Sequence, residues 1–315
     1  MFRLLRACMR RYTHNVIFWI STLLTIGIAV IVSVSARRTF FDDAMVITQM
    51  VIHAIMISWV VGKEFKEGIF RNKVIVGHSK GTIYLAELFS AVGIAFVIYL
   101  LYAAIFVVVN FYEVPLLPAS LIAKIFIDYV LLNMCLAAIF VTISCLFSNQ
   151  ALIAIVNIVF VLLMVVGSQR FYGELSQPQY LESYETINSE WIDENGNIRY
   201  KEVKVEGSEY LVDNPTYVGG VKRDIYETLY NLSPYGHIIE FVYFNMDWHG
   251  YDYFMGTFAE ENGMTGEEAW EMVIGDNEIT EETIEMFDTN LIYSLVLLVL
   301  ASSIGYIGFW KKELK

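Results

Sequence analysis

Polar side chains inside long apolar runs are the residues of this sequence whose types and spacing could do chemistry. Gln49 and His53 lie four residues apart, so a helix places them on one face, and Asn157 interrupts another apolar run. Burying such groups in lipid costs about 2–3 kcal/mol or more. Each therefore either lines a polar route or hydrogen-bonds to a neighbouring helix. The hydrogen-bonding interpretation is favoured for Asn133, and both stay open for Gln49 and His53.

A charged segment with regularly spaced aromatic residues separates the second apolar run from the third. Phe65, Ile69 and Phe70 form an apolar patch at helical spacing, and Glu67 and Arg71 are placed for an i,i+4 ion pair. A short amphipathic helix between two spans must lie on the membrane or dock into a partner. The mixed charges of this segment favour a protein partner over an anionic lipid surface.

No nucleotide-binding or hydrolytic motif accompanies these residues. The string from Gly77 to Thr82 has the letters of a phosphate-binding loop in the wrong order, so the chain is not expected to bind ATP on its own. The five histidines are scattered, which disfavours a metal site. The sequence therefore predicts a chain that is not itself an enzyme and holds no cofactor or metal.

Three further charged residues fall near the ends of apolar runs. Glu87 lies about one turn into the third run, and Lys124 and Asp128 lie one turn apart near the start of the fourth. Side chains at that depth can extend to the membrane surface, and Lys124 and Asp128 can pair at i,i+4. We therefore expect all three to reach toward the interface.

Six apolar runs carry these residues, and each approaches the roughly 20 helical residues that cross a bilayer. Of the 315 residues, 56% are hydrophobic and 17% are charged, and the mean hydropathy is +0.51. These values exclude a disordered chain and argue against an ordinary soluble enzyme. The expected fold class is an all-α polytopic membrane protein. The runs are approximately Val16–Ala36, Ala44–Val61, Thr82–Phe111, Ile122–Phe147, Ala151–Gly167 and Leu291–Trp310.

Charge divides the chain into regions. Residues 169–289 carry 26 Asp and Glu against 6 Lys and Arg, whereas the rest of the chain carries 8 against 15. Lys and Arg gather at both termini and between the second and third runs, which places these parts on the cytoplasmic side. We expect five spans and the connecting segment 62–81 within residues 1–168, an acidic extracytoplasmic domain over 169–289, and the sixth span with a cytoplasmic tail in 290–315.

The acidic region has the pattern of a small α+β domain. Asn195-Gly196 lies between two stretches suited to strands, and such a pair favours the tight turn of a β-hairpin. Helix start and stop signals follow it. The expected elements are a hairpin of residues 185–192 and 198–205, and helices over 221–232, from Thr265 onward, and over 278–287.

The connecting segment contains three strings that together form a pattern: Lys63–Lys73, Gly77-His78-Ser79-Lys80 and Tyr84-Leu85-Ala86. They resemble the second-to-third-span segment of ABC-type export permeases, above all the bacitracin and lantibiotic exporter and immunity permeases. Those proteins show a Glu-Phe pair, a small residue, a basic stretch, then Gly-x-Ser-Lys/Arg before a span that begins with Tyr-Leu. The exterior string from Asn214 to Pro234 is similar to that of Gram-positive members. The exterior insert of about 120 residues is large for this class.

The resemblance implies partners and a mechanism. Two permease chains, identical or sister, would pair in the plasma membrane of a bacterium, and two separate ATP-binding subunits would carry ATP and Mg²⁺. Residues 2–12 would form a connecting helix beside the coupling helix. The coupling helix seated on the ATPase would consist of Glu64, Phe65, Lys66, Glu67, Ile69, Phe70 and Arg71.

The resemblance also implies a route and a substrate class. The second and fifth spans, with Gln49, His53 and Asn157, would line the translocation route. The chain would move an antimicrobial peptide or another amphipathic substrate out of, or away from, the membrane. The acidic domain would attract cationic peptides over long range, and its charge would serve solubility equally well. Membrane lipid is the other expected contact, and nucleic acid is not expected.

Two other function classes stay open. A sensory or accessory membrane protein would bind a ligand with its exterior domain and relay the signal through its spans without an ATPase partner. An intramembrane enzyme needs a nucleophile and a base within the spans. His53 has no nearby candidate partner in the sequence, so this class ranks last.

Overall fold

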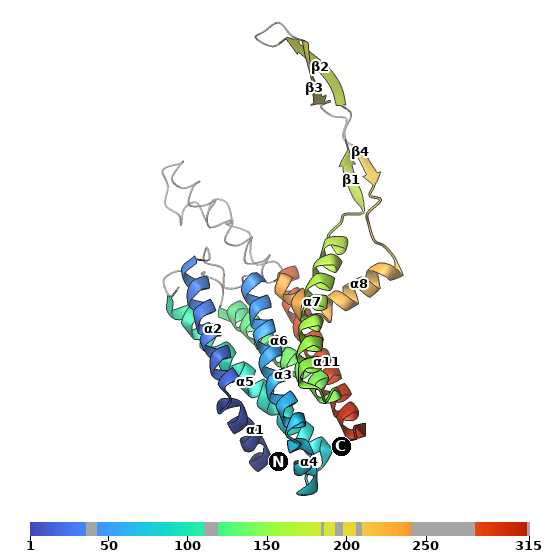
Figure 1. Cartoon of the computed structure of the whole chain (residues 1–315). Coiled ribbons are helices and arrows are strands. Elements are labelled where there is room, and N and C mark those ends of the chain that lie inside the picture. The colour runs from blue at the N-terminus through green and yellow to red at the C-terminus, as the bar shows by residue number, and fades with distance from the viewer. Residues whose placement is uncertain are drawn as a thin grey trace. The chain divides into compact units, whose positions relative to one another are not determined.

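The computed structural model describes residues 1–35, 43–109, 119–183, 186–192, 198–205, 210–240 and 281–313. Within these residues the chain is mostly helical (Figure 1). Five helices are long and apolar enough to cross a membrane, and a sixth span results if the bent pair of α1 and α2 is counted as one. The helical, membrane-type fold expected from the sequence is confirmed.

The helices of the bundle follow the apolar runs of the sequence. α1 (Phe2–Thr13) meets α2 at a bend of 65°. The helix expected over 278–287 is confirmed from Glu281 onward, where it forms the first turns of α11 and continues into the last span without a break; residues 278–280 lie outside the described residues. The long helices are α2 (Val16–Ser35), α3 (Asp43–Lys66), α5 (Lys80–Val109), α6 (Ala119–Leu146), α7 (Gln150–Leu175) and α11 (Glu281–Lys311).

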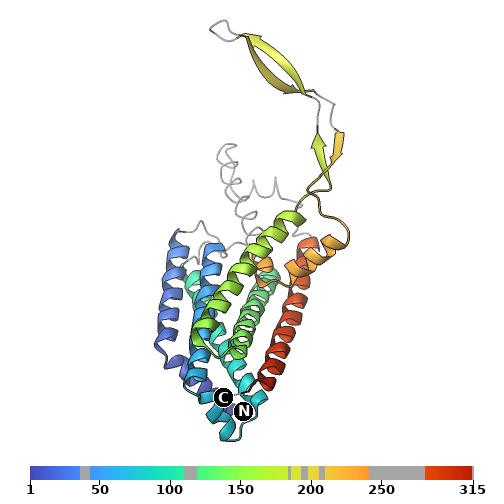
Figure 2. The ribbon, with the colours of Figure 1, turned by 45° about the vertical axis from the view of Figure 1, so that its right-hand side comes forward.

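α6 is the central helix of the bundle. It packs against α3, α5 and α11, and 72% of its apolar span is buried, compared with 28% for α7 and 17% for α11. The apolar faces that α7 and α11 leave exposed are suited to lipid. Both chain termini lie at one end of the bundle (Figures 1 and 2).

A close helix crossing fixes α11 against α5 and α6. The Tyr84 hydroxyl of α5 lies 3.0 Å from the Thr142 hydroxyl of α6, and Thr142 donates at 3.0 Å to the carbonyl of Ala301 in α11. A Cβ on Gly305 of α11 would overlap the Tyr84 and Thr142 hydroxyls. Only glycine therefore permits this approach without displacing the two side chains.

The connecting segment does not form the single amphipathic helix expected over residues 64–71. α3 continues through Lys66, and Gly68 then adopts a φ of 67°, a left-handed conformation that interrupts the helix. A second helix, α4 (Ile69–Ile75), follows, and Gly77 at a φ of 99° turns the chain into α5. Gly68 and Gly77 explain why the expected single helix does not form, because each allows a sharp change of chain direction.

The described residues fall into two compact units, Met1–Ser168 with Asn231–Lys315, and Gln169–Tyr230. The second unit therefore holds only part of the expected domain 169–289. It contains two antiparallel ribbons, β1 with β4 and β2 with β3. Its elements are β1 (Tyr180–Ser183), β2 (Thr186–Ile192), β3 (Ile198–Lys204), β4 (Tyr210–Asp213) and α8 (Val221–Asn231).

The local predictions for the second unit are confirmed where the structure describes it. Residues 186–192 pair with 198–204, from Thr186 opposite Lys204 to Ile192 opposite Ile198, which is the expected hairpin. α8 covers the expected helix that ends before Pro234. The helix expected from Thr265 onward lies outside the described residues.

Candidate functional site

Five polar side chains from four helices meet in the interior of the bundle near the end that holds the termini. We call them the ionic cluster. Lys73 Nζ lies 2.6 Å from a Glu64 carboxylate oxygen and 2.5 Å from one of Glu87. Arg11 pairs with the other Glu64 oxygen, and the Cys8 thiol donates to Glu87 at 2.9 Å. Cys8, Glu64, Lys73 and Glu87 are all buried.

The turn at Gly68 brings the ionic cluster together. α3 delivers Glu64 in its last turn, and the left-handed glycine directs α4 so that Lys73 reaches back to it. α5 supplies Glu87 and α1 supplies the remaining two members. Lys73 is the hub, because it bonds to α3 and α5 at once while belonging to α4.

The charges of the ionic cluster balance. Two carboxylates, Glu64 and Glu87, face two cations, Arg11 and Lys73. Burial lowers the pKa of Lys73, but the Glu87 and Glu64 carboxylates raise it, and the net result is a pKa above the ordinary lysine value. Lys73 is therefore charged at neutral pH. Removing one partner from such a buried set costs about 3–5 kcal/mol, because an uncompensated charge remains.

Three members of the ionic cluster also have the spacing of metal ligands. One ligand atom each of Cys8, Glu64 and Glu87 lies within 4.8 Å of the others. The Lys73 ammonium stands among them, at 2.5 and 2.6 Å from the carboxylates and 3.6 Å from the Cys8 sulfur. A cation of the protein itself thus occupies the place that a metal ion would take.

The expectations for the charged residues near span ends need correction. Glu87 is fully buried in the ionic cluster and does not reach the interface. Lys124 bonds to Asp288 of α11 at 2.6 Å and not to Asp128. Asp128 is fully buried and accepts a hydrogen bond from Ser294 at 3.1 Å. Glu87 and Asp128 are thus buried beside polar partners on other helices, whereas Lys124 and Asp288 form a partly exposed pair, which leaves the expectation that Lys124 reaches the interface untested.

The predicted coupling residues divide into an inner and an outer set. Glu64 and Phe70 are buried, and Phe65 and Phe70 pack on each other and on Phe309 of α11, with ring centroids 4.4, 6.3 and 5.3 Å apart. The apolar patch is therefore an internal contact, and Ile69 is half-buried beside it. The exposed members are Lys66, Glu67 and Arg71.

Two exposed apolar residues extend the outer set beyond the prediction. Ile75 and Val76, at the end of α4, are 70% and 78% exposed. The sequence marks Ile75 and Val76 only as apolar, and this does not distinguish exposed apolar residues from buried ones. The predicted i,i+4 pair is also different: Glu67 lies 3.6 Å from Lys63.

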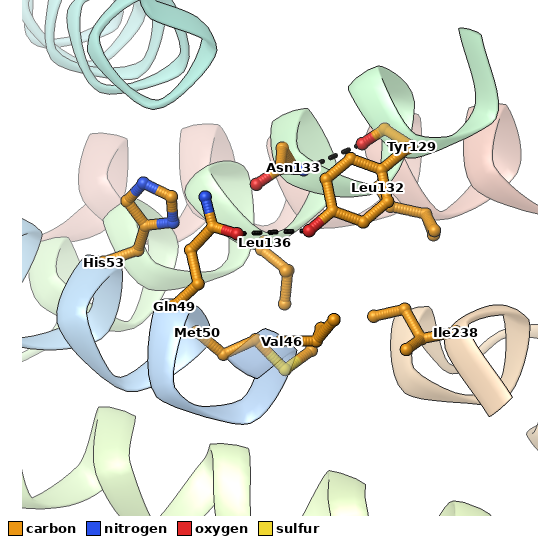
Figure 3. A pocket seen from close by; sticks show the side chains of 9 residues that line it. All are labelled: Val46, Gln49, Met50, His53, Tyr129, Leu132, Asn133, Leu136 and Ile238. Atoms are coloured by element: carbon orange, nitrogen blue, oxygen red, sulfur yellow. Dashed lines mark hydrogen bonds between the residues drawn. The ribbon is translucent and has the colours of Figure 1, made fainter. Parts of the chain in front are cut away.

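The polar residues of the second span line a small pocket between α3 and α6 (Figure 3). Gln49 accepts a hydrogen bond from the Tyr129 hydroxyl at 3.1 Å, and Asn133 donates to the Tyr129 carbonyl at 2.8 Å. Among the described residues, Gln49 Nε2 and His53 Nε2 have no hydrogen-bond partner. The cavity of about 10 Å³ has room for about one water molecule.

Asn157 lies apart from this pocket. Its amide donates to Ser58 of α3 at 2.7 Å and to Ser144 of α6 at 3.1 Å. The side chain is fully buried and joins three helices. The structure thus brings Gln49 and His53 together and places Asn157 in a separate contact that fixes α7 to the bundle.

Comparison with family models and with curated proteins gives no match. No family model matches the chain, and no curated protein is significantly similar to it. A function for the chain therefore rests on the sequence pattern and on the geometry described above.

Proposed function

We propose that this chain is the membrane-spanning permease subunit of an ATP-driven exporter. It pairs with a second permease chain, identical or sister, and with two ATP-binding subunits that carry ATP and Mg²⁺. The substrate is an antimicrobial peptide or another amphipathic molecule that is moved out of, or away from, the membrane. The resemblance of the connecting segment and the helical, apolar fold support the proposal.

The observation that carries the proposal is the attachment of α4 to the spans. Lys73 of α4 bonds to Glu64 at the end of α3 and to Glu87 within α5. A displacement of α4 therefore moves two long helices, since buried ion pairs with short contacts resist stretching. A nucleotide-driven push at α4 is transmitted in this way without any chemistry in this chain.

The outer surface of the same segment is suited to a protein partner. We define the docking surface as six exposed residues of the connecting segment, from the last turn of α3 to the end of α4. Ile75 and Val76 are its apolar members, and its other four residues carry charges of both signs, a mixture that suits a protein interface. The docking surface consists of Lys63, Lys66, Glu67, Arg71, Ile75 and Val76.

The proposal places the remaining features by their chemistry. Both termini and α4 face the cytoplasm of a bacterium, and the acidic region faces outside, in keeping with the distribution of Lys and Arg. Gln49 and His53 on α3, and Asn157 on α7, mark the helices that line the route when two chains pair. The acidic region attracts cationic peptides to its entrance.

Co-purification tests the proposal. The chain is isolated in mild detergent with the ATP-binding subunit encoded by a neighbouring gene, and the complex is quantified by size exclusion and ATPase activity. Val76→Asp should weaken association by about 5- to 150-fold, because a charge on an apolar contact residue of an interface costs about 1–3 kcal/mol. Val221→Asp is the matched control, since Val221 is 74% exposed on α8 in the other unit.

Three results would count against the proposal. One is a well-folded chain that never associates with a Walker-motif ATPase, which would favour the sensory or accessory function. The second is a full complex with the Val76→Asp variant, which would show that the docking surface does not bind the ATP-binding subunit. Equal loss with both variants would indicate a general folding defect and would likewise contradict the assignment.

A further inference from the structure

A second buried polar cluster lies at the end of the bundle opposite the termini. It surrounds His237, which lies in a helix whose described residues are 234–240. Tyr235, His237, Ile238 and Ile239 of this helix are all buried. A buried imidazole ring needs polar partners, and α6 and α11 contribute to them.

Three oxygen atoms face the imidazole ring of His237. Nε2 lies 2.6 Å from the carbonyl oxygen of Asn231. Nδ1 lies 3.5 Å from the Ser294 hydroxyl of α11 and 3.7 Å from an Asp128 carboxylate oxygen of α6. Ser294 donates its own proton to the other Asp128 oxygen at 3.1 Å, so toward the ring it can only accept.

This arrangement requires one more proton than a neutral ring and an ionised carboxylate would hold. The Asn231 carbonyl fixes a hydrogen on Nε2, which in a neutral ring leaves a lone pair on Nδ1 facing Asp128. That Asp128 oxygen has no hydrogen-bond partner among the described residues, although the side chain is fully buried. A proton on Nδ1 gives the ring a positive charge, and the Asp128 carboxylate at 3.7 Å, too far for a hydrogen bond, is then its ion-pair partner.

We infer that Asp128 and His237 form a proton-binding site that holds the helix of residues 234–240 in the bundle. The site takes one proton, carried by the His237 ring opposite the Asp128 carboxylate, and the pair then carries no net charge. It is not a nucleophilic triad, because the serine and the aspartate both face Nδ1 and no base is directed at the hydroxyl alone.

The other charged groups nearby are already paired. Glu240, on the same helix, accepts a hydrogen bond from Asn290 of α11 at 2.8 Å. Burial raises the pKa of Glu240 above its ordinary value. Lys124 of α6 bonds to Asp288 of α11. Glu240 is the one rival for the proton among these described groups, and a test must separate it from Asp128.

Loss of the proton opens the helix of residues 234–240. Deprotonation leaves a buried negative charge on Asp128 beside the acid Glu240, and burying an unpaired charge is costly. Ile238, the residue after His237, lines the pocket of Gln49 and His53 (Figure 3). Alkaline pH therefore uncovers that pocket. That the helix seals a transport route rests on the proposed function. The proton site itself does not depend on the proposed function.

Hydrogen exchange of the full chain in mild detergent tests the inference. Protection factors for residues 235–240, corrected for the intrinsic pH dependence of exchange, are measured by mass spectrometry from pH 6 to pH 9. With the helix packed in the bundle the site holds one more proton than when the helix is detached. Protection should therefore fall with rising pH, by at most about tenfold per pH unit while only the packed state keeps the proton, and should level off once both states have lost it.

Two variants separate the candidate proton carriers. In Asp128→Asn the neutral amide needs no positive charge on His237, so protection should be retained and should vary less than about threefold over the same range. Glu240→Gln is the matched control and should keep the decline of the natural chain. The experiment needs no ATPase partner, so its failure is distinct from failure of the transport proposal.

Two outcomes would overturn the proton site. A flat profile in the natural chain would do so without reference to any variant, which covers the case that Asp128→Asn does not fold. A decline in Asp128→Asn together with a flat profile in Glu240→Gln would assign the proton to Glu240.

Discussion

At the scale of single residues, one lysine accounts for the arrangement of four helices. Lys73 fills the space between three potential metal ligands and neutralises two buried carboxylates together with Arg11. A buried charge set of this kind adds little net stability over an apolar packing of equal volume, but it is costly to break. It specifies which helices meet, because only this combination leaves no charge uncompensated.

Lys73→Met should destabilise the chain by about 3–5 kcal/mol, because Glu64 and Glu87 would face each other without the cation between them. Arg71→Met, an exposed basic residue on the same helix, should change stability by less than about 0.5 kcal/mol. The measurement is the temperature at which half of the detergent-solubilised protein loses its monodisperse size-exclusion peak. Equal midpoints for the two variants would contradict the importance given to Lys73.

At the scale of elements, glycines decide how the helices meet. Gly68 separates α4 from α3 through its left-handed conformation, whereas Gly305 lets α11 approach α5 and α6. The first effect is conformational and the second is steric, since a Cβ at Gly305 would occupy the space of two hydroxyl groups.

Gly305→Val should weaken the packing of α11 by about 1–3 kcal/mol, because Tyr84 and Thr142 must move to admit the side chain. Gly27→Val is the control, since a Cβ on Gly27 of α2 meets no atom within 4 Å. Thermal stability of the two variants in detergent is compared with that of the natural chain. A larger loss in Gly27→Val than in Gly305→Val would show that helix propensity, not close packing, governs these sites.

At the scale of the whole molecule, the described residues form two compact units that differ in character. The first unit consists of apolar helices built around α6. The second contains two-stranded ribbons, and β2 and β3 pair only with each other within the described part of the chain. A two-stranded ribbon is marginally stable by itself in water, so the stability of the chain comes from the helical unit.

Replacing residues 186–204 with Gly-Gly should therefore leave membrane insertion intact and shift the thermal midpoint by less than about 2 °C, because no ladder partner outside the removed hairpin is lost. Insertion is measured by membrane fractionation and the midpoint in mild detergent. The full chain is the reference. A hairpin-deleted chain that aggregates or unfolds at a much lower temperature would show that the hairpin stabilises the helical unit.

Local order is what the sequence determined by itself. Apolar run length places the spans, because a helix must satisfy its own backbone in lipid. The Asn195-Gly196 pair and the residues on either side predict the β2–β3 hairpin, since turn chemistry acts over only a few residues. α8 follows from its own pattern and from Pro234 in the same way.

The tertiary structure alone decided the partners of the polar residues. Glu64 and Phe70 were expected at a surface and lie inside, and Lys124 pairs with Asp288, far along the chain, and not with Asp128, one turn away. Hydrophobic periodicity shows that a face is buried and says nothing about which helix covers it. A charged side chain near the end of a span either reaches the membrane surface or pairs with a buried counter-charge. Which of the two occurs depends on neighbours that only the folded bundle supplies.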